Sequence, residues 1–492
     1  MARRTTSRSY PTGQETKAGY VSARIEAPDV PDYVVVELRY ESPVAYTPSG
    51  FRAPEAAAPQ ADSLNTVLAR YQIDRVRSQF GLKPGDIRSR IEVAAALPPE
   101  PSPERYAGRG MDSTFFQSNF AQVVPKRRGD AAKIARELNR RKAVWNAFVA
   151  PRPVPAMPEG SVAGSRLFEP AQGYLHAPPT GIGAVEVWGL AGAKGQGVTI
   201  CDIEGNWNRT HQDLPTGIQL IGGTVIPELD WRNHGTAVLG EMVSRPDGKG
   251  AVGISHRATA VVHSAIINGV FNTAGAINNA ANQLGAGDVI LIELQGTGPN
   301  GKFVAMQFWS DVFTAIKAAT AKGITVVEAA GNGNENFELA MFTNTGLQKD
   351  SGAIVVGAGV PPTNHFDFDS SYDPLGVPRS RIWFSNHGSI VNVQGWGWHV
   401  TTLGYGDAQG GQTQKTWYTL RFSGTSSASP IVTGAVACLQ GRAKAKNGAP
   451  LTPAKVRQIL MDTGTPQQQG PGVPLTQHIG PLPNLPLAMQ QV

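Results

Sequence analysis

The stretch SGTSSASPIVTGAVA, residues 423–437, decides how the rest of the chain is interpreted. Ser426 precedes a run of small and apolar residues that is typical of a buried helix. A hydroxyl at the start of a helix lies where unpaired backbone N–H groups favour developing negative charge. Serine is also a common N-cap residue. On its own, the stretch therefore leaves open a catalytic nucleophile and an ordinary helix cap.

Three earlier segments supply partners for such a nucleophile. Asp202 ends an apolar strand, His234 opens an amphipathic helix, and Asn332 lies in a glycine-rich turn after a strand. Acyl transfer needs a nucleophile, a base, a group that orients the base, and donors for the oxyanion. The chain contains all of these groups, although each residue also has an ordinary structural alternative. The segments are GVTICDIEGNW (197–207), NHGTAVLGEMV (233–243) and VVEAAGNGN (326–334).

The HGT, AAGN and GTSxASP elements, in this order, resemble the subtilisin family of serine peptidases. The resemblance covers about Gly192 to Thr463, and residues 451–466 look like the family's closing helix. It implies a serine endopeptidase that hydrolyses protein or peptide substrates through an acyl-enzyme, with no cofactor in the chemistry. Transpeptidation by the same acyl-enzyme stays open. A catalytically inactive protein-binding module on the same scaffold is the alternative from another class.

The resemblance implies a role for each residue of the constellation. Ser426 is expected to attack the scissile carbonyl, His234 to accept its proton, and Asp202 to orient His234. The side-chain amide of Asn332 and the backbone N–H of Ser426 are expected to bind the oxyanion. The segment LIELQGTG (291–298) lies where the family binds the substrate backbone. The implied substrate contacts are Leu294, Gln295 and Gly296.

Two carboxyl groups lie on successive predicted strands close to the expected specificity pocket. They belong to Glu293 and Glu328. Close carboxyl groups tend to share a proton or attract a cation, so we expect a pocket or proton-sharing role for this pair. Hydrogen bonds to the backbone, or to an arginine such as Arg257, are the alternative.

The chain departs from the family pattern after Asp202. The segment up to Asp213 and Leu214 carries about two extra residues, and Glu204 stands where a small residue is common. Asp213 aligns with a position that often helps to bind structural calcium. The resemblance therefore makes Asp213 a weak calcium candidate, and the insertion argues against it.

Beyond about Ser165, apolar strands alternate with helices. This pattern predicts an α/β fold for residues 165–492, with a parallel β-sheet flanked by helices on both faces. The predicted strands are 198–203, 258–266, 289–294, 324–330 and 353–358. The predicted helices are 234–243, 273–284, 304–321, 426–439 and 453–461.

Residues 33–150 predict a separate small α+β domain. Strands are expected at 33–40, 87–95, 114–124 and 143–149, and helices at 61–80 and 130–142, in the β-α-β-β-α-β order of a ferredoxin-like unit. Subtilisin-like enzymes are commonly made with such a unit as an inhibitory propeptide, which implies a self-processing zymogen. A permanent substrate- or partner-binding domain is the alternative. Residues 1–32 predict a disordered arm, and residues 151–164 a proline-rich linker.

Charge is unevenly divided along the 492 residues. Residues 1–150 hold 23 Lys and Arg against 16 Asp and Glu, a balance of +7, whereas residues 151–492 hold 21 against 22, or −1. The basic residues are interspersed with acids, so nucleic-acid binding is not expected. The opposite signs favour docking of the two parts, less so at high salt.

Several other classes of protein are disfavoured by the sequence. No stretch approaches the roughly 18 apolar residues of a membrane span. The N-terminus lacks the apolar segment of a signal peptide, which leaves the cytoplasm as the default and export by another route open. The two cysteines are too few for a disulfide framework, and we expect buried free thiols at Cys201 and Cys438.

Overall fold

The computed structural model describes residues 31–98, 111–153, 168–362 and 376–492. Within these ranges, seven strands form a parallel sheet in the order β17-β16-β15-β12-β7-β9-β8. The apolar runs predict five of them but not the edge strands β8 and β17. β8 is short and only half-buried, so it lacks the continuous apolar run of a buried parallel strand. The strands are β7 (Thr199–Glu204), β8 (Gln219–Gly222), β9 (Thr259–Ser264), β12 (Val289–Ile292), β15 (Thr325–Ala329), β16 (Ile354–Gly359) and β17 (Val391–Trp396).

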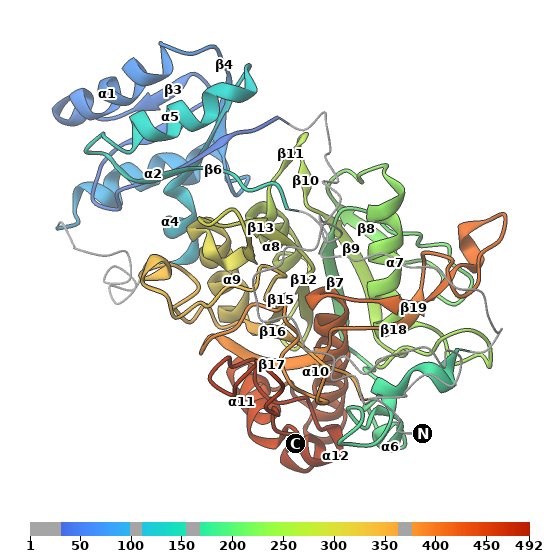
Figure 1. The fold of residues 1–492 in the computed structure, drawn as a ribbon. Coiled ribbons are helices and arrows are strands. Elements are labelled where there is room, and N and C mark those ends of the chain that lie inside the picture. Colours follow the sequence, from blue (N-terminus) through green and yellow to red (C-terminus); the bar gives the residue numbers. More distant parts are fainter. Residues whose placement is uncertain (1–30, 99–110, 154–167, 363–375) are drawn as a thin grey trace, which may run out of the picture.

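Helices cover both faces of this sheet, which confirms the predicted α/β architecture (Figure 1). α7 (Leu229–Val243) and α10 (Thr425–Asn447) pack on one face, and α8 (Thr273–Ala281) and α9 (Ser310–Ala321) on the other. The peripheral elements are α6 (Ala184–Val187), α11 (Pro453–Thr463), α12 (Leu485–Ala488), and the hairpins β10 (Ile266–Ile267) with β11 (Val270–Phe271), β13 (Gln295–Thr297) with β14 (Phe303–Ala305), and β18 (Val400–Leu403) with β19 (Tyr418–Phe422).

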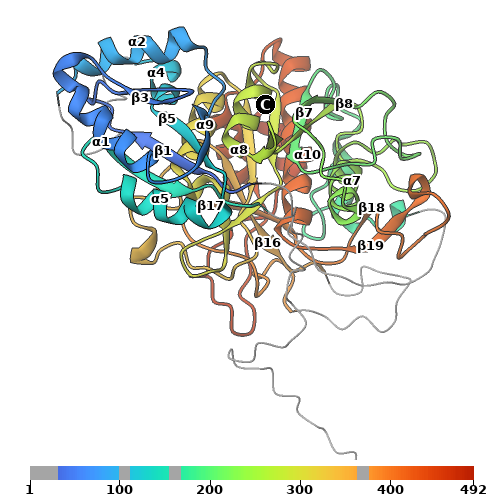
Figure 2. The ribbon, with the colours of Figure 1, turned by 90° about the horizontal axis from the view of Figure 1, so that it is seen from above.

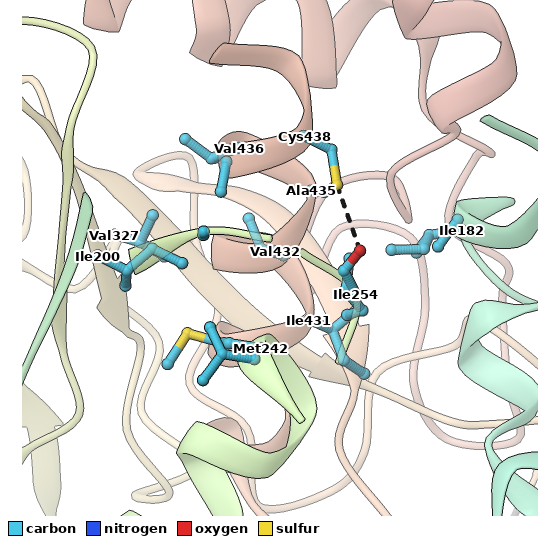
Figure 3. Close-up of a cluster of buried hydrophobic side chains, with 14 of the residues drawn as sticks. Ile182, Ile200, Met242, Ile254, Val327, Ile431, Val432, Ala435, Val436 and Cys438 are labelled. Atoms are coloured by element: carbon cyan, nitrogen blue, oxygen red, sulfur yellow. Dashed lines mark hydrogen bonds between the residues drawn. The ribbon is translucent and has the colours of Figure 1, made fainter. Parts of the chain in front are cut away.

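The α10 side of the sheet is filled by a buried apolar cluster (Figure 3). Val432 and Val436 of α10 lie over Ile200 of β7 and Val327 of β15. Gly434 allows the close approach of α10 to its neighbour, because a Cβ there would lie 2.6 Å from Cβ of Ile254. Gly434 in the 423–437 stretch therefore lets the helix pack closely on the segment that joins α7 to β9.

Both cysteines are buried free thiols, as predicted. The Cys438 thiol lies 3.4 Å from the carbonyl oxygen of Ile254 (Figure 3), whereas Cys201 points into the opposite face of the sheet. Burial raises the pKa of both thiols. Neither thiol is therefore in the ionised form that reacts or binds metal.

The N-terminal part forms a separate antiparallel sheet in the order β4-β5-β1-β6, the strand order of a split β-α-β unit. Its strands are β1 (Val34–Leu38), β4 (Ile73–Ser78), β5 (Phe120–Pro125) and β6 (Val144–Val149), and a small hairpin joins β2 (Ala45–Thr47) to β3 (Gly50–Arg52). The helices are α1 (Ala58–Leu68), α2 (Pro84–Ala95), α4 (Ser113–Ser118) and α5 (Ala131–Leu138). We call this part the N-terminal unit.

Three predicted elements of the N-terminal unit are wrong. The single helix expected over 61–80 is α1 followed by the strand β4, and the strand expected over 87–95 is the helix α2. The strand expected over 114–124 begins with the helix α4. For α2, Pro84 at the first helical position and Asp86 in the first turn are helix-start signals that outweigh the β-branched residues further on.

The open face of the N-terminal sheet packs on α8 and α9 (Figures 1 and 2). Along β1, Val34 and Val36 point into the unit's own core, whereas Tyr33 and Val35 join the apolar cluster that contains α8 and α9. Phe120 contributes to the same cluster. The period-two alternation of the strand therefore gives this sheet two apolar faces, and one of them covers the larger domain.

Hydrogen bonds also join the N-terminal unit to the larger domain. The Tyr33 hydroxyl donates to the Phe271 carbonyl at 2.5 Å, and Gln79 Nε2 donates to Asp311 Oδ2 at 2.5 Å. Ser310 Oγ donates to Glu37 Oε2 at 2.9 Å. Ser310 and Asp311 open α9, so the two contacts hold carboxylates close to the positive end of its dipole.

Some predictions lie largely outside the described residues. They are the arm over 1–32 and the linker over 151–164, of which only residues 31–32 and 151–153 are described. Among the described helices, none has the length and apolar character that crossing a membrane requires.

Candidate active site

Strand ends and helix starts meet at one edge of the parallel sheet. Glu204 is the last residue of β7 and contacts His234 on α7. Asn332 follows β15 and contacts Thr425, the first residue of α10. Open parallel sheets place their sites at this carboxyl edge. The structure thus joins His234 to an acid of the 197–207 segment and Asn332 to the start of the 423–437 segment. The acid is Glu204, whereas the sequence predicted Asp202.

The acidic partner of His234 is Glu204. Nδ1 of His234 forms a short hydrogen bond with Oε1 of Glu204, and both side chains are fully buried. The edge of the imidazole packs against Phe422, with ring centroids 5.3 Å apart and planes at 77°. His234 is the sixth residue of α7, which starts at Leu229 rather than at His234 as predicted. The ring is therefore fixed by a carboxylate and by an aromatic neighbour.

The predicted contact between Asp202 and His234 is wrong. Asp202 Oδ2 instead accepts a hydrogen bond from Nε1 of Trp207 at 2.7 Å. Asp202 and Glu204 are two residues apart on β7, so both point to the face covered by α7. His234 lies against the end of the strand, and only Glu204 reaches it.

The number of residues between β7 and Asp213 already points to Glu204 as the acid of the site. The two extra residues counted between Asp202 and Asp213 disappear when the count begins at Glu204. An acid two residues further along the same strand face thus accounts for the apparent insertion. The side chain of glutamate is longer than that of aspartate by one methylene. Gly235 leaves room for it, since a Cβ at residue 235 would lie 2.4 Å from Glu204 Oε2.

Ser426 is the second residue of the 23-residue helix α10. The preceding Gly424 has φ of 111°, a conformation that L side chains rarely adopt, at the turn from β19 into the helix. Among the described residues, neither Ser426 Oγ nor His234 Nε2 has a hydrogen-bond partner, although both atoms are buried. The hydroxyl and the free imidazole nitrogen are each left without a competing partner.

Asn332 is held from two sides. Its Oδ1 accepts from the backbone N–H of Thr425 at 2.9 Å and from the Thr425 hydroxyl at 3.0 Å. Its own backbone N–H donates to Oε1 of Gln295 at 2.8 Å. Because Thr425 occupies the oxygen of the amide, the NH₂ group is the part of the side chain left to donate to another group.

Burial favours the neutral form of each titratable group in this region. It lowers the pKa of His234 to about 3 and raises the pKa of Asp202 to about 7. Burial, together with the neighbouring Asp202 and Glu293, also raises the pKa of Glu204 well above its usual range. A neutral imidazole is the form that can accept a proton at Nε2.

The predicted substrate strand lies beside the end of the N-terminal unit. Gln295 and Gly296 belong to β13, and a Cβ on Gly296 would lie 3.1 Å from Cβ of Pro151. Leu294 is buried in the apolar core, and the Gln295 side chain is engaged with Asn332. Backbone groups are therefore what this segment can present to a substrate, and Gly296 itself is buried in this structure.

The structure contradicts the predicted pairing of Glu293 with Glu328. Glu328 lies on β15 on the α9 side of the sheet, where its Oε1 accepts from the backbone N–H of Gln307 at 2.7 Å. Glu293 follows β12 on the α10 side, and its Oε2 lies 2.7 Å from Ser429 Oγ. Alternation along β12 and β15 puts the two carboxyl groups on opposite faces. Glu328 therefore has the alternative role considered from the sequence, a hydrogen bond to the backbone.

The surroundings of Asp213 do not fit a calcium ion. Its Oδ2 accepts from the backbone N–H of Ala251 at 2.9 Å, and the Tyr418 hydroxyl also hydrogen-bonds its carboxylate. These partners present hydrogens, whereas calcium takes six to eight oxygen ligands. Among the described residues, no cluster of three or more His, Cys, Asp or Glu side chains is arranged to hold a metal.

Three solved structures are similar to this chain at low sequence identity. Fervidolysin from Fervidobacterium pennivorans, a keratinolytic enzyme related to subtilisin, is 16% identical with a TM-score of 0.51, over 95% of this chain and 62% of that chain. This chain thus spans less than two thirds of the length of fervidolysin. A protease from Pseudoalteromonas arctica PAMC 21717 is 19% identical with a TM-score of 0.46, over 68% and 99%. The prenylagaramide maturation protease PagA is 20% identical with a TM-score of 0.44, over 63% and 97%.

A comparison with curated proteins finds no match. A model of the subtilase family matches residues 195–480, which is 286 of the 492 residues and more than half of the chain. The matched range contains Glu204, His234, Asn332 and Ser426. The chain therefore belongs to the subtilase family of serine peptidases.

Proposed function

We propose that this chain is a serine endopeptidase that hydrolyses proteins or peptides through an acyl-enzyme, with no cofactor in the chemistry. The observation that carries the proposal is the fixed imidazole of His234. Glu204 engages its Nδ1, its Nε2 is unpaired, and Ser426 stands in the first turn of α10 with an unpaired hydroxyl. This is the set of groups that acyl transfer requires.

The residues take the following parts in the proposed reaction. Ser426 Oγ attacks the scissile carbonyl while Nε2 of His234 accepts the hydroxyl proton. In this reaction Glu204 acts as a carboxylate that accepts from Nδ1–H, so that Nε2 is free to take the proton, and it stabilises the imidazolium that forms. The positive charge of the imidazolium in turn favours the ionised form of Glu204 against the effect of burial. His234 then donates the proton to the leaving amine, and water hydrolyses the acyl-enzyme by the same steps in reverse.

The oxyanion of the tetrahedral intermediate needs preorganised donors. The NH₂ group of Asn332, whose orientation Thr425 sets, and the backbone N–H of Ser426 are the donors we propose. The N-terminus of the long helix α10 adds a favourable dipole at the same point.

We further propose that the N-terminal unit is an intramolecular inhibitor and that the chain is a self-processing zymogen. Three observations support this. The unit docks on α8 and α9, Pro151, which follows its last strand, lies beside Gly296, and Ser426 and His234 have no exposed surface in the described state. Substrate can therefore reach Ser426 only after a rearrangement.

A fluorophosphonate probe tests the peptidase directly. After an incubation that allows self-processing, we expect the protein to be labelled on Ser426, and the Ser426→Ala variant to be unlabelled and unable to process itself. N-terminal sequencing after incubation should show a new start after the N-terminal unit in the wild type alone. A folded wild-type protein that takes no label either before or after the incubation would reject the peptidase in favour of an inactive binding module. A fully active chain that still begins before Tyr33 would count against a removable inhibitor.

A further inference from the structure

Four buried acids lie in the space between the sheet and the helices α7 and α10. They are Asp202 and Glu204 on β7, Glu241 on α7, and Glu293 after β12, and none has exposed surface. Among the described residues, only Glu204 of these four forms an ion pair, with His234. The mechanism proposed above uses Glu204 and leaves the other three acids without a part.

Glu293 is the one of these acids that faces the nucleophile. Its Oε2 lies 2.7 Å from Oγ of Ser429, which is three residues and nearly one turn beyond Ser426 on α10. Ser429 Oγ also lies 2.8 Å from the carbonyl oxygen of Thr425. The carboxyl group of Glu293 is thus hydrogen-bonded to the first turns of α10, the helix that carries the nucleophile.

The other oxygen of Glu293 is unpaired beside an unpaired hydroxyl. Among the described residues, neither Glu293 Oε1 nor Ser426 Oγ has completed a hydrogen bond. The two groups are nonetheless close enough for Ser426 to lower the pKa of Glu293 against the larger effect of burial. Glu293 and the proposed base His234 thus both have an unpaired polar atom in the site of the Ser426 hydroxyl.

The surroundings of Glu293 keep it uncharged. Burial raises its pKa well above the usual range, and the nearby Asp202 raises it further, while the hydroxyls of Ser429 and Ser426 lower it. Glu293 in turn raises the pKa of Glu241 and Glu204. A charge on Glu293 would therefore be opposed by acids on both β7 and α7.

We infer that Glu293, in its neutral form, is a positioning residue for the Ser426 nucleophile, and that ionisation of its carboxyl makes Ser426 less reactive. This inference rests on the proposed peptidase function. A neutral carboxyl beside Ser426 costs the reaction nothing, since the proton of Ser426 leaves to His234. A carboxylate there would stand next to the oxyanion that forms, in a site with little water to screen the repulsion.

The test measures the rate at which a fluorophosphonate probe labels Ser426 as a function of pH, in protein first incubated so that it can process itself. For the wild type we expect this rate to fall at alkaline pH, by about tenfold per pH unit beyond the transition. In Glu293→Gln, which keeps the shape but cannot ionise, the alkaline fall should disappear.

Ser429→Ala gives a directional check. The Ser429 hydroxyl stabilises the charged form of Glu293 and lowers its pKa, so its removal should move the alkaline fall to higher pH. A merely structural role of Glu293 would not predict this shift. Thermal unfolding of each variant would show that the fold is retained.

Glu328→Gln is the matched control. Glu328 is equally buried and its pKa is raised to about 8, but it lies on the opposite face of the sheet. The control should keep the wild-type alkaline fall. A wild type with no alkaline fall, or a Glu293→Gln variant that retains it, would overturn the inference. If the wild type takes no label at any pH, the proposed peptidase function fails instead.

Discussion

At the scale of the residue, the identity of the acid that orients His234 has consequences that can be measured. Glu204 touches Nδ1 of His234, whereas Asp202 holds the indole N–H of Trp207. Replacing the orienting acid of a serine peptidase by its amide lets the imidazole take the wrong tautomer, which costs about 10⁴-fold in turnover. We therefore expect a loss of this order in peptide hydrolysis for Glu204→Gln.

Asp202→Asn is the matched comparison on the same strand face. An asparagine oxygen can still accept from Nε1 of Trp207. Because Asp202 does not touch His234, we expect the activity of the variant to stay within about tenfold of wild type. Steady-state hydrolysis of a fluorogenic peptide by both variants decides between the two acids. A severe loss in Asp202→Asn with a mild one in Glu204→Gln would restore the prediction made from sequence.

The sequence identifies the residues in the short motifs, but it does not identify the acid that pairs with His234. Ser426, His234 and Asn332 sit in short motifs whose order and spacing limit them to one position each. Asp202 and Glu204 are two residues apart, so alternation along the strand sends both to the same face and cannot choose between them. The choice depends on how far β7 extends toward α7, which is a matter of tertiary packing.

At the scale of the element, α7 depends on glycine at the residue after His234. Alanine is normally favoured over glycine inside a helix by about 1 kcal/mol. At Gly235, however, a Cβ would lie 2.3 Å from the carbonyl oxygen of Asn206 and 2.4 Å from Glu204 Oε2. The neighbours are backbone and a buried acid, so they cannot move away easily.

We expect Gly235→Ala to destabilise the protein by about 1–3 kcal/mol, because overpacking outweighs helix propensity. It should also lower activity, since it displaces Glu204 from His234. Urea unfolding in a Ser426→Ala background, which prevents self-digestion, would measure the stability. Gly189→Ala is the control, because nothing lies within 4 Å of a Cβ there. Equal stability of Gly235→Ala and Gly189→Ala would contradict the steric argument.

Elements with strong end signals or long apolar runs are the ones that sequence predicts well. β12 and residues 425–441 of α10 are buried throughout and consist almost entirely of apolar or small residues. β4 is hidden in a helical pattern because its residues Ile73–Ser78 alternate with charges, and only its pairing with β5 makes it a strand. Such partner-dependent elements need the tertiary fold to be identified.

At the scale of the whole molecule, the N-terminal unit is held mainly by apolar surface and by hydrogen bonds at the start of α9. The opposite net charges of residues 1–150 (+7) and residues 151–492 (−1) attract each other only at longer range. One buried acid at the interface gives the contact a pH dependence. Burial raises the pKa of Asp311 from 3.8 to about 6, partly offset by hydrogen bonds from Val312 N–H and the Gln79 amide.

The sign of this dependence follows from linkage. A carboxyl whose pKa is higher in the folded protein than in the unfolded chain binds its proton more tightly when folded. Its stabilising contribution is therefore complete below about pH 4 and is lost as the pH rises toward 6. A shift of this size corresponds to roughly 2–3 kcal/mol. The interface should be tightest in acid and looser at neutral pH.

Asp311→Asn should remove this dependence, because asparagine resembles the protonated acid and can still accept from Gln79 Nε2. In a Ser426→Ala background, the free energy of unfolding in urea of Asp311→Asn should equal that of the protein with Asp311 intact near pH 4 and exceed it by roughly 2–3 kcal/mol near pH 7. The exposed Asp62→Asn controls for the change of net charge and should show no such pH-dependent difference. If the difference between the Asp311→Asn variant and the protein with Asp311 intact stays constant from pH 4 to 7, Asp311 is not the group that loosens the contact of the N-terminal unit as the pH rises.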